Sequence, residues 1–375
     1  MKLARAAWLA VLTAAILSIA LTGAGHGSTM LPTAKGTFFV SPEGSDANPG
    51  TAARPWRTIT KALNKLNPGQ RALVRPGAYG RIRCEHGRGG SASGGYVTVK
   101  AYPARRAVVK AAADGVVWVN CDYVRIQGFV ISGPAVVGGT NVYGVEGADH
   151  VQIVGNEIRD SICQGISLEE QTDAWRITRN WIHDNGDGCD EQAHGIYLQG
   201  DDHLVANNVI DRQPEGYGIQ VYDYDRNPRI VNNTIAHSGK GGVVVGGSGC
   251  RFEGRCGVAG ALVANNVLAY NSTEGVTRDR SASPKSCDIH SNLAYGNGSG
   301  SYEGGWPDGC LVGNRTANPR FVDSGHDFRL RARSPAIGAA DPRVAVSPDY
   351  DGVTRPQGRR PDAGAYEFRR SAAGR

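Results

Sequence analysis

The chain has 375 residues, of which 20% are charged, with 52 glycines, 8 cysteines and a formal net charge of +6. This small excess, without runs of Lys or Arg and without a nucleic-acid-binding motif, argues against nucleic acid as a partner. It suits an acidic polymer without requiring one. The length could hold two domains, but one repeat domain would account for most of it.

The first 28 residues have the pattern of a secretory signal peptide. Lys2 and Arg5 precede an apolar run at residues 6–21, and small residues follow at 22–28. The apolar run is too short for a membrane span, and small residues follow it. We therefore expect residues 1–28 to be removed, and the mature protein to be secreted to the extracellular space as a monomer without membrane attachment.

Residues 37–72 are expected to cap one end of a repeat domain. A strand at 38–40 leads through a loop rich in Gly, Asn and Pro to a short helix at 58–66. The apolar face of this helix carries Ile59, Ala62, Leu63 and Leu66. Because the first coil of a solenoid would otherwise expose an apolar cross-section, we interpret the helix as a plug.

Residues 73–330 carry a repeated pattern with two halves. The first half is a Gly followed by an alternating apolar run, at Gly144, Gly165, Gly195, Gly218, Gly242 and Gly275. The second half is a strand-like run that ends in Asn, at Asn156, Asn180, Asn208, Asn233, Asn266 and Asn292. These Asn residues recur every 24 to 33 positions with no helical segment between them, which indicates a solenoid. We predict an all-β fold, a right-handed parallel β-helix, with an Asn ladder along its axis.

Eight cysteines in an exported chain favour disulfides over metal sites. Cys250 and Cys256 lie in the longest repeat and are expected to staple an insertion. Two further pairs, Cys163 with Cys189 and Cys287 with Cys310, are each about one coil apart. Cys84 and Cys121 would then form the fourth bridge, although the sequence alone leaves the connectivity open.

Two stretches resemble a known family. Residues 38–63, FFVSPEGSDANPGTAARPWRTITKAL, followed by VRPGAYGRI, look like the opening of secreted right-handed β-helix proteins of the pectate-lyase-like superfamily. SPAIGAAD and DYDGVTRPQGRRPDAGAYEF resemble the closing segment of many bacterial β-helix proteins, expected here at 331–368. The resemblance implies a polysaccharide lyase or C5-epimerase-like protein. Because the same scaffold also carries hydrolases and binding proteins, it specifies the architecture better than the reaction.

Aligning the repeats on their Gly places aromatic and charged residues on outward positions of neighbouring coils. The cluster consists of His194, Tyr197, Tyr217, Gln220 and Tyr222, flanked by Glu169, Glu170, Lys240, Arg278 and Arg280. Flat rings can stack on sugars, and charges can bind carboxylates and hydroxyls. Gly241, Val244 and Gly246 predict an open floor beside the cluster. The alternative is that Tyr and His simply prefer half-exposed strand positions.

This cluster predicts a lyase that cleaves an acidic, uronate-containing polysaccharide by β-elimination. The reaction needs a base for the proton next to the carboxylate, and a cation to neutralise that carboxylate. We expect His194 and Tyr217 to act as base and proton donor, and Lys240 to bind the carboxylate. Tyr222 completes the expected catalytic set. The expected substrate-binding residues are Glu169, Tyr197, Gln220, Arg278 and Arg280.

Three other functions remain open on the same scaffold. Tyr217 aligns with the catalytic Tyr of alginate C5-epimerases, but Gln220 and Tyr222 stand where that family has Asp and His. Asp201 and Asp202 resemble the paired carboxylates of polygalacturonase-type hydrolases. A non-catalytic glycan-binding or surface protein could use the same aromatic face.

Calcium is the one cofactor that the sequence suggests. The loop at residues 184–191 is acidic, and Asp187, Asp190 and Glu191 could supply the hard oxygen ligands that Ca²⁺ prefers. The full Asp and Lys set of the β-helix pectate lyases is not found. An Asp- and Gly-rich loop of this kind is often only a turn.

Overall fold

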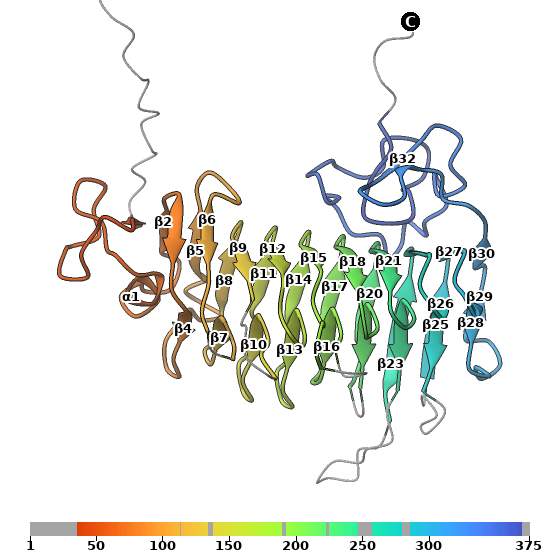
Figure 1. The fold of residues 1–375 in the computed structure, drawn as a ribbon, viewed down its shortest axis with the longest axis horizontal. Helices are drawn as coiled ribbons and strands as arrows, with labels where there is room; N and C mark the ends of the chain where they lie inside the picture. The colour runs from red at the N-terminus through yellow and green to blue at the C-terminus, as the bar shows by residue number, and fades with distance from the viewer. Residues whose placement is uncertain are drawn as a thin grey trace, which may run out of the picture. The chain divides into compact units, whose positions relative to one another are not determined.

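The chain winds into coils that build three parallel β-sheets, here called sheets A, B and C (Figure 1). The computed structural model describes residues 36–112, 114–133, 138–189, 193–222, 225–246, 257–279 and 286–369. The predictions for the signal peptide and for Cys250, Cys256, Asp190, Glu191 and Arg280 lie outside these ranges. Strands that are neighbours in a sheet come from consecutive coils, which confirms the predicted parallel β-helix.

Sheet A contains β1 (Thr37–Val40), β2 (Arg71–Val74), β5 (Val97–Ala101), β8 (Val124–Gln127), β11 (Gln152–Val154), β14 (Arg176–Thr178), β17 (Leu204–Ala206), β20 (Arg229–Val231), β23 (Ala259–Ala264), β26 (Ser286–His290) and β29 (Leu311–Val312). Sheet B contains β3 (Gly77–Tyr79), β6 (Ala107–Val109), β9 (Val130–Ser132), β12 (Glu157–Arg159), β15 (Trp181–His183), β18 (Val209–Gln213), β21 (Thr234–Ser238), β24 (Val267–Ala269), β27 (Leu293–Tyr295) and β30 (Arg315–Thr316). Sheet C contains β4 (Ile82–Cys84), β7 (Val117–Val119), β10 (Val142–Gly144), β13 (Ile166–Leu168), β16 (Ile196–Leu198), β19 (Ile219–Val221), β22 (Val243–Val245), β25 (Glu274–Arg278) and β28 (Gly300–Glu303).

Inward positions of the strands form the core because side chains alternate between the two faces of a strand. Most three-residue strands of sheet C have buried first and third residues and a half-buried middle residue. Ile166, Ile196 and Ile219 are opposite one another in register and fully buried, so identical side chains stack from coil to coil. This stacking positions the middle residues on the outside of the sheet.

The predicted Asn ladder is present in the turn between sheets A and B. Asn208 shows the pattern: its Oδ1 accepts hydrogen bonds from the backbone N–H and the side-chain amide of Asn180, at 2.9 and 3.0 Å. Its amide in turn donates to Asn233 Oδ1 and to the carbonyl of Ile177. Asn156, Asn266, Asn292 and Asn314 continue the ladder.

We expect Asn208→Ala to lower the free energy of unfolding by about 3 kcal/mol, because it leaves several buried polar groups without partners. Asn67→Ala is the matched control, because Asn67 is exposed and its side chain forms no hydrogen bond within the described ranges. Urea denaturation followed by circular dichroism measures both. Equal stability of the two variants would mean that the ladder contributes little.

The predicted N-terminal helix is shorter than expected. Helix α1 spans Ile59–Leu63, and Thr58 caps its N-terminus by accepting a hydrogen bond from the N–H of Lys61. Ile59, Ala62 and Leu63 are buried in the main core cluster, but a plugging role for this helix remains a prediction. In the described ranges, no helix is long and apolar enough to span a membrane. β1, which was expected in the cap, is instead the edge strand of sheet A.

Three of the four predicted disulfides are confirmed: Cys84–Cys121, Cys163–Cys189 and Cys287–Cys310. The last two join cysteines about one coil apart, as the spacing indicated. Disulfides are typical of proteins that reach an oxidising compartment. They agree with the prediction of secretion, which itself rests on residues 1–28.

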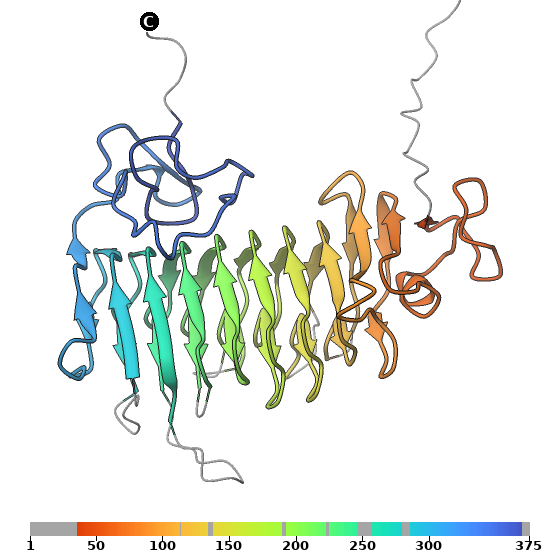
Figure 2. The ribbon, with the colours of Figure 1, turned by 180° about the vertical axis from the view of Figure 1, so that it is seen from behind.

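The parallel sheets end at β30, and the chain then forms a C-terminal segment, residues 317–369, beside the coils (Figure 2). It begins with an antiparallel pair, β31 (Phe321–Asp323) and β32 (Asp327–Leu330), instead of the continued coils expected to 330. A second apolar cluster joins this segment to sheet B, and includes Val209, Val267, Leu293, Phe321, Phe328 and Tyr366. The segment therefore covers part of the outer face of sheet B. This apolar contact does not involve sheet C.

Candidate functional site

The middle residues of the sheet C strands form one outward row along the axis. Each lies opposite its counterpart in the next coil, and from β4 to β25 the row consists of Arg83, Trp118, Tyr143, Ser167, Tyr197, Gln220, Val244 and Thr277. We call it the sheet C row. Adjacent members are about 4.8 Å apart, the spacing of strands in a sheet. One extended polymer could therefore contact several members at once.

An aromatic platform occupies the N-terminal part of the sheet C row. Trp118 and Tyr143 stack with ring centroids 5.0 Å apart and an interplanar angle of 23°. The guanidinium groups of Arg81 and Arg83 lie 5.2 and 5.8 Å from the centre of the Trp118 ring. These four half-buried residues are the aromatic platform. Arg83 is paired with Glu85 at 2.8 Å, and Arg81 donates to the carbonyls of Gly115 and Asp114. The flat rings suit a sugar face, and the guanidinium donors that these bonds leave over can bind a sugar carboxylate.

Aligning the repeats on their Gly did not reveal this platform, because the alignment placed the coil of Gly144 in the wrong register. Gly144 is opposite Leu168 and not opposite Gly165, so it ends β10 instead of preceding a strand. Its lack of a side chain makes room for the buried ring of Trp175, which would lie 2.7 Å from a Cβ at this position. The alternation of buried and outward residues in β7 and β10 is the signal that could have revealed Trp118 and Tyr143.

Glu169, an expected substrate-binding residue, is held beside the platform. Its carboxylate accepts a hydrogen bond from the Tyr143 hydroxyl and another, of 3.0 Å, from the backbone N–H of Glu146. Burial, and then the hydrogen bond to Glu169, raise the pKa of Tyr143. Tyr143 therefore stays protonated at neutral pH, and Glu169 fixes the direction in which its hydroxyl points.

His194 and Tyr217 lie together, but His194 does not point outward as expected. Their ring centroids are 5.8 Å apart, and only 1% of the surface of His194 is exposed. Its Nδ1 accepts a hydrogen bond of 3.1 Å from the backbone N–H of Tyr217, so the neutral ring carries its proton on Nε2. Among the described residues, this buried Nε2 has no hydrogen-bond partner.

Burial, and then the positive charge of Lys240, lower the pKa of His194 from 6.5 to about 3. His194 is therefore a neutral imidazole at pH 7. The lone pair of its unprotonated nitrogen is already engaged by Tyr217. A ring in this state can orient its neighbour, but it is poorly suited to take a proton from a substrate.

The lowered pKa predicts a pH-dependent stability. Between about pH 6.5 and pH 3 the unfolded chain binds a proton at His194 that the folded chain does not, so stability falls as the pH falls. The slope from one such group is about 1.4 kcal/mol per pH unit. We expect His194→Gln to show a smaller loss of unfolding free energy between pH 7 and pH 4.5 than the wild type. Parallel losses in the two proteins would contradict the lowered pKa.

The structure brings the other expected catalytic residues, and Tyr197 of the expected substrate-binding set, together around His194. The ring of Tyr197 is nearly parallel to that of His194, at 6.0 Å, and lies 5.8 Å from that of Tyr222. Lys240 Nζ is 5.5 Å from the centre of the Tyr217 ring. All but His194 are half-buried. We call Tyr197, Tyr217, Tyr222 and Lys240 the tyrosine cluster.

The remaining residues that were expected at the site differ in whether they reach its outer face. Gln220 follows Tyr197 in the sheet C row. The prediction of an open floor at Gly241, Val244 and Gly246 is wrong, because all three residues are buried. Arg278 lies opposite the buried Val245, on the line of inward positions, so it is not an outward neighbour of Gln220.

Asp187 is exposed, and its two expected partners lie outside the described residues. Within those residues, no group of three or more His, Cys, Asp or Glu side chains is placed to hold a metal ion. The calcium site therefore remains a prediction.

Asp201, proposed as one of a carboxylate pair, is not in the sheet C row. It belongs to a line of aspartates in the turns that precede sheet A, with Asp122, Asp149 and Asp173. In this line each carboxylate accepts a hydrogen bond from a backbone N–H of the next coil. Asp202 accepts a hydrogen bond from Asn227. These contacts indicate a structural role for the pair.

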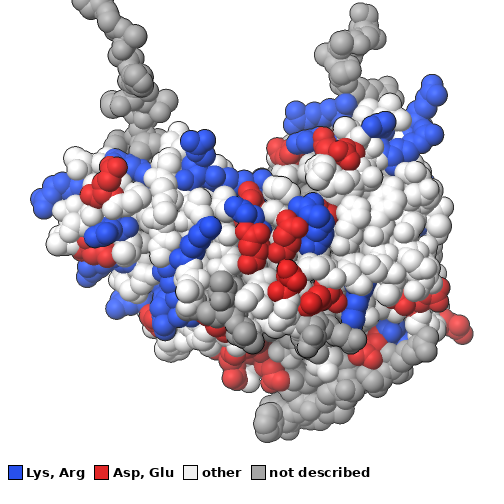
Figure 3. Space-filling view, viewed as in Figure 1, with Lys and Arg blue, Asp and Glu red and all other residues white. Residues whose placement is uncertain are grey.

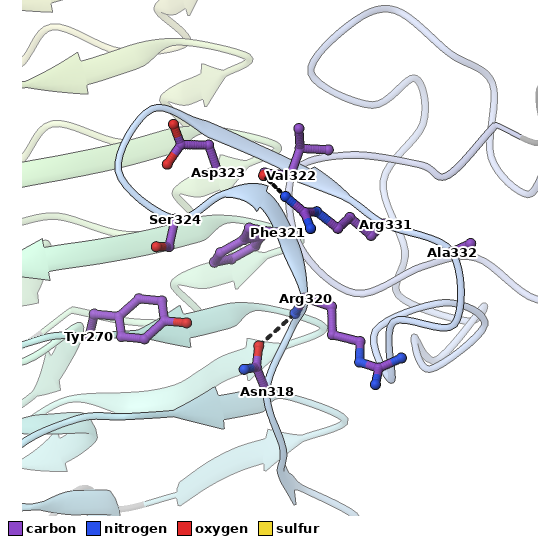
Figure 4. Close-up of a pocket in the computed structure, with 9 residues that line it drawn as sticks. All are labelled: Tyr270, Asn318, Arg320, Phe321, Val322, Asp323, Ser324, Arg331 and Ala332. Carbon is purple, nitrogen blue, oxygen red and sulfur yellow. Dashed lines mark hydrogen bonds between the residues drawn. The ribbon is translucent and has the colours of Figure 1, made fainter.

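A cavity of about 830 Å³ lies away from the sheet C row, between Tyr270 and the C-terminal segment (Figure 4). Most of its lining side chains are exposed. Several polar groups at its edge are already paired: Asn318 Oδ1 accepts a hydrogen bond of 2.8 Å from the N–H of Arg320, and Arg331 donates to the carbonyl of Val322. Its lining includes Asp323 and the rings of Tyr270 and Phe321, but no row of side chains in register along the coils, and the sheet C row remains the candidate site.

Comparison with known proteins first identifies the class of protein. A family model described as right-handed beta helix region matches residues 105–256 and 164–322, which together cover more than half of the chain. The chain belongs to this right-handed β-helix family. A second model, described as a protein of unknown function (DUF1565), matches residues 42–86. No curated protein matches the chain.

Solved structures of similar fold include several enzymes. A pectate lyase, Pel9A, is 16% identical with a TM-score of 0.58, over 90% of this chain and 97% of that chain. A rhamnogalacturonan lyase is 18% identical with a TM-score of 0.51, over 70% and 75% of the two chains. A glycoside hydrolase is 9% identical with a TM-score of 0.55, over 80% and 99%. At these identities the likeness concerns the fold alone.

Proposed function

We propose that the protein is a secreted enzyme that binds an acidic, uronate-containing polysaccharide along the sheet C row and cleaves it by β-elimination. The supporting observation is that Trp118 and Tyr143 of the aromatic platform and Tyr197 of the tyrosine cluster lie in one row. Tyr222 packs beside Tyr197, and Lys240 lies over the ring of Tyr217. The pectate lyase and the rhamnogalacturonan lyase among the similar structures make a polysaccharide the first substrate to test.

In this reaction a base removes the proton from the carbon next to the carboxylate. The bond to the leaving sugar oxygen then breaks, a carbon–carbon double bond forms, and the leaving oxygen takes up a proton. We assign both proton transfers to Tyr217: its phenolate would remove the proton from the carbon, and the hydroxyl formed in this way would return that proton to the leaving oxygen on the same side of the sugar ring. Lys240 neutralises the sugar carboxylate and stabilises the negative charge that develops beside it.

The proposal changes the role expected for His194. With its pKa lowered to about 3 and its Nδ1 bonded to Tyr217, we assign it to positioning Tyr217. Tyr197, Gln220 and Tyr222 would contact the sugar at the reaction centre.

A substrate screen tests this function. Elimination leaves an unsaturated uronate that absorbs in the ultraviolet, so we would incubate the protein with pectate, alginate, glucuronan and glycosaminoglycans and follow absorbance. New absorbance with one polymer is the expected result. New reducing ends without absorbance would favour a hydrolase, changed uronate composition an epimerase, and binding without any product a glycan-binding protein.

The platform predicts a selective effect on substrate binding. Trp118→Ala should raise KM for the polymer about tenfold, equivalent to about 1.4 kcal/mol of lost binding, with kcat nearly unchanged. Trp118→Phe keeps a flat ring and should lose less. A fall in kcat without a rise in KM would place the reaction centre at the platform instead.

A further inference from the structure

Charged side chains of both signs are intermixed on the face of the molecule in Figure 3. On such a surface, arginines without acidic partners are the best indication of an anion-binding site. Two such arginines lie at sheet A, the sheet that the candidate site does not use: Arg176 begins β14, and Arg179 follows its last residue. Among the described residues, the side chains of Arg176 and Arg179 form no hydrogen bond or ion pair.

These arginines border a cavity of about 320 Å³ between sheet A and the C-terminal segment. Its polar lining on the sheet side includes Arg125, Gln127, Gln152, Arg176 and Arg179. No Asp or Glu among the described residues lines it. Three guanidinium groups therefore face one cavity without a carboxylate among them, which makes the cavity electropositive.

The geometry of sheet A orders these groups along the axis. Arg125, Gln152 and Arg176 are opposite one another in three consecutive coils, so the two arginines are about 9.6 Å apart. Arg125 Nε donates a hydrogen bond of 2.7 Å to Gln152 Oε1. Its guanidinium lies 5.2 Å from the centre of the Tyr96 ring, and Tyr96 lies 5.7 Å from Tyr123.

The other wall of the cavity is fixed to the coils. The Asn207 amide donates hydrogen bonds of 2.9 and 2.8 Å to the carbonyls of Val346 and Pro348, on either side of Ser347. The carboxylates in the turns that precede sheet A are engaged with the backbone: Asp149 and Asp173 each accept a hydrogen bond from an N–H of the next coil. This wall and Arg125 are therefore held in place by the protein, whereas Arg176 and Arg179 keep their guanidinium donors for a ligand.

We propose that this cavity is a second binding site, for a carboxylated sugar in an acidic polysaccharide chain. Arg176 and Arg179 would bind a carboxylate, since guanidinium groups match carboxylates with two parallel hydrogen bonds. Gln127 and Gln152 would bind hydroxyls, and Tyr96 would keep the Arg125 guanidinium in place beside them. The ligand class rests on the proposed function, whereas the unpaired arginines are independent of it.

The site would tether the polymer and not cleave it. It lies on sheet A, whereas Tyr217 and Lys240 are next to strands of sheet C, so a chain bound in the cavity leaves the tyrosine cluster accessible to another part of the same polymer. A tether raises the local concentration of substrate at the second site. The benefit should be large for a long polymer and absent for a short oligosaccharide.

The test compares Arg176→Glu/Arg179→Glu with Arg54→Glu/Arg57→Glu in the full chain. The control changes the net charge by the same amount at two exposed arginines in the loop before α1. Binding of pectate, alginate and neutral dextran is measured by isothermal titration calorimetry at low and at physiological salt. Tyr217→Phe serves as the background, because its lowered turnover limits the consumption of polymer during the titration.

We expect the Arg176→Glu/Arg179→Glu variant to bind the acidic polymer at least tenfold more weakly than the background protein, and the control to bind within twofold of it. The difference should shrink at higher salt, because salt screens charge pairs. Equal affinity of the two variants, equally strong binding of dextran, or no binding of either acidic polymer would overturn the site. If no polymer is cleaved but the affinity difference is found, the proposed reaction fails while the second site stands.

Discussion

Tyr217→Phe is expected to lower turnover of the acidic polymer about a hundredfold or more, with the melting temperature nearly unchanged. The substitution removes only the hydroxyl that we assign to proton transfer, and such transfers typically contribute about 10²- to 10⁴-fold to a rate. The ring that packs against His194 and lies under Lys240 remains. Initial rates measured from the unsaturated product, together with thermal melts, give both quantities.

Tyr102→Phe is the matched control, because Tyr102 is 39% exposed and lies outside both proposed sites. It should retain wild-type turnover. Full activity of Tyr217→Phe would remove Tyr217 from the mechanism, and Tyr222 would become the next hydroxyl to test. A large drop in its melting temperature would instead show that the hydroxyl supports the fold.

Arg355→Met should lower the free energy of unfolding by about 3–5 kcal/mol, the largest stability effect that we expect. Arg355 and Glu367 form a salt bridge of 2.9 Å with each side chain only 1% exposed. Arg355 also donates a hydrogen bond of 3.1 Å to Asn207 Oδ1, which ties the C-terminal segment to a coil. Removing the cation leaves the buried Glu367 carboxylate with only the backbone N–H groups of Gln357 and Asp362 as partners and without a counter-charge.

Arg355→Met/Glu367→Leu should recover much of this loss, since it removes both charges and keeps an apolar volume. Arg359→Met is the control in the same segment, because Arg359 is exposed and forms no side-chain hydrogen bond within the described ranges. Denaturant titrations compare the three variants. If Arg355→Met is as stable as the control, the buried pair does not fasten the segment.

The architecture was predictable from sequence because a solenoid repeats its contacts. Each Asn of the ladder bonds the next, so the same residue must recur in every coil, and its spacing gave both the period and two of the disulfides. Gly144 shows where this reasoning fails. It has the same residue type as Gly165 but accommodates the ring of Trp175, and a long-range packing contact of that kind leaves no periodic signal.

The candidate site was predictable only in part. The alignment of the repeats on their Gly placed His194, Tyr197, Tyr217 and Tyr222 near one another, and the ring distances confirm this prediction. It did not show that His194 turns into the protein, because that depends on a bond from its Nδ1 to a backbone N–H in the next coil. The arginines facing the sheet A cavity were also missed, since the C-terminal segment that walls the cavity is more than a hundred residues away in sequence.

The spacing of the sheet C row sets a length scale for the ligand. Trp118 and Gln220 are separated by four strand spacings, about 19 Å, along a straight line of strands. A single sugar can occupy the platform or the tyrosine cluster, but it cannot bridge them. The affinity should therefore increase with each added sugar until the oligosaccharide spans the distance from the aromatic platform to the tyrosine cluster. Longer oligosaccharides should bind with about the same affinity. Discrimination by chain length would follow from the rise of the solenoid alone.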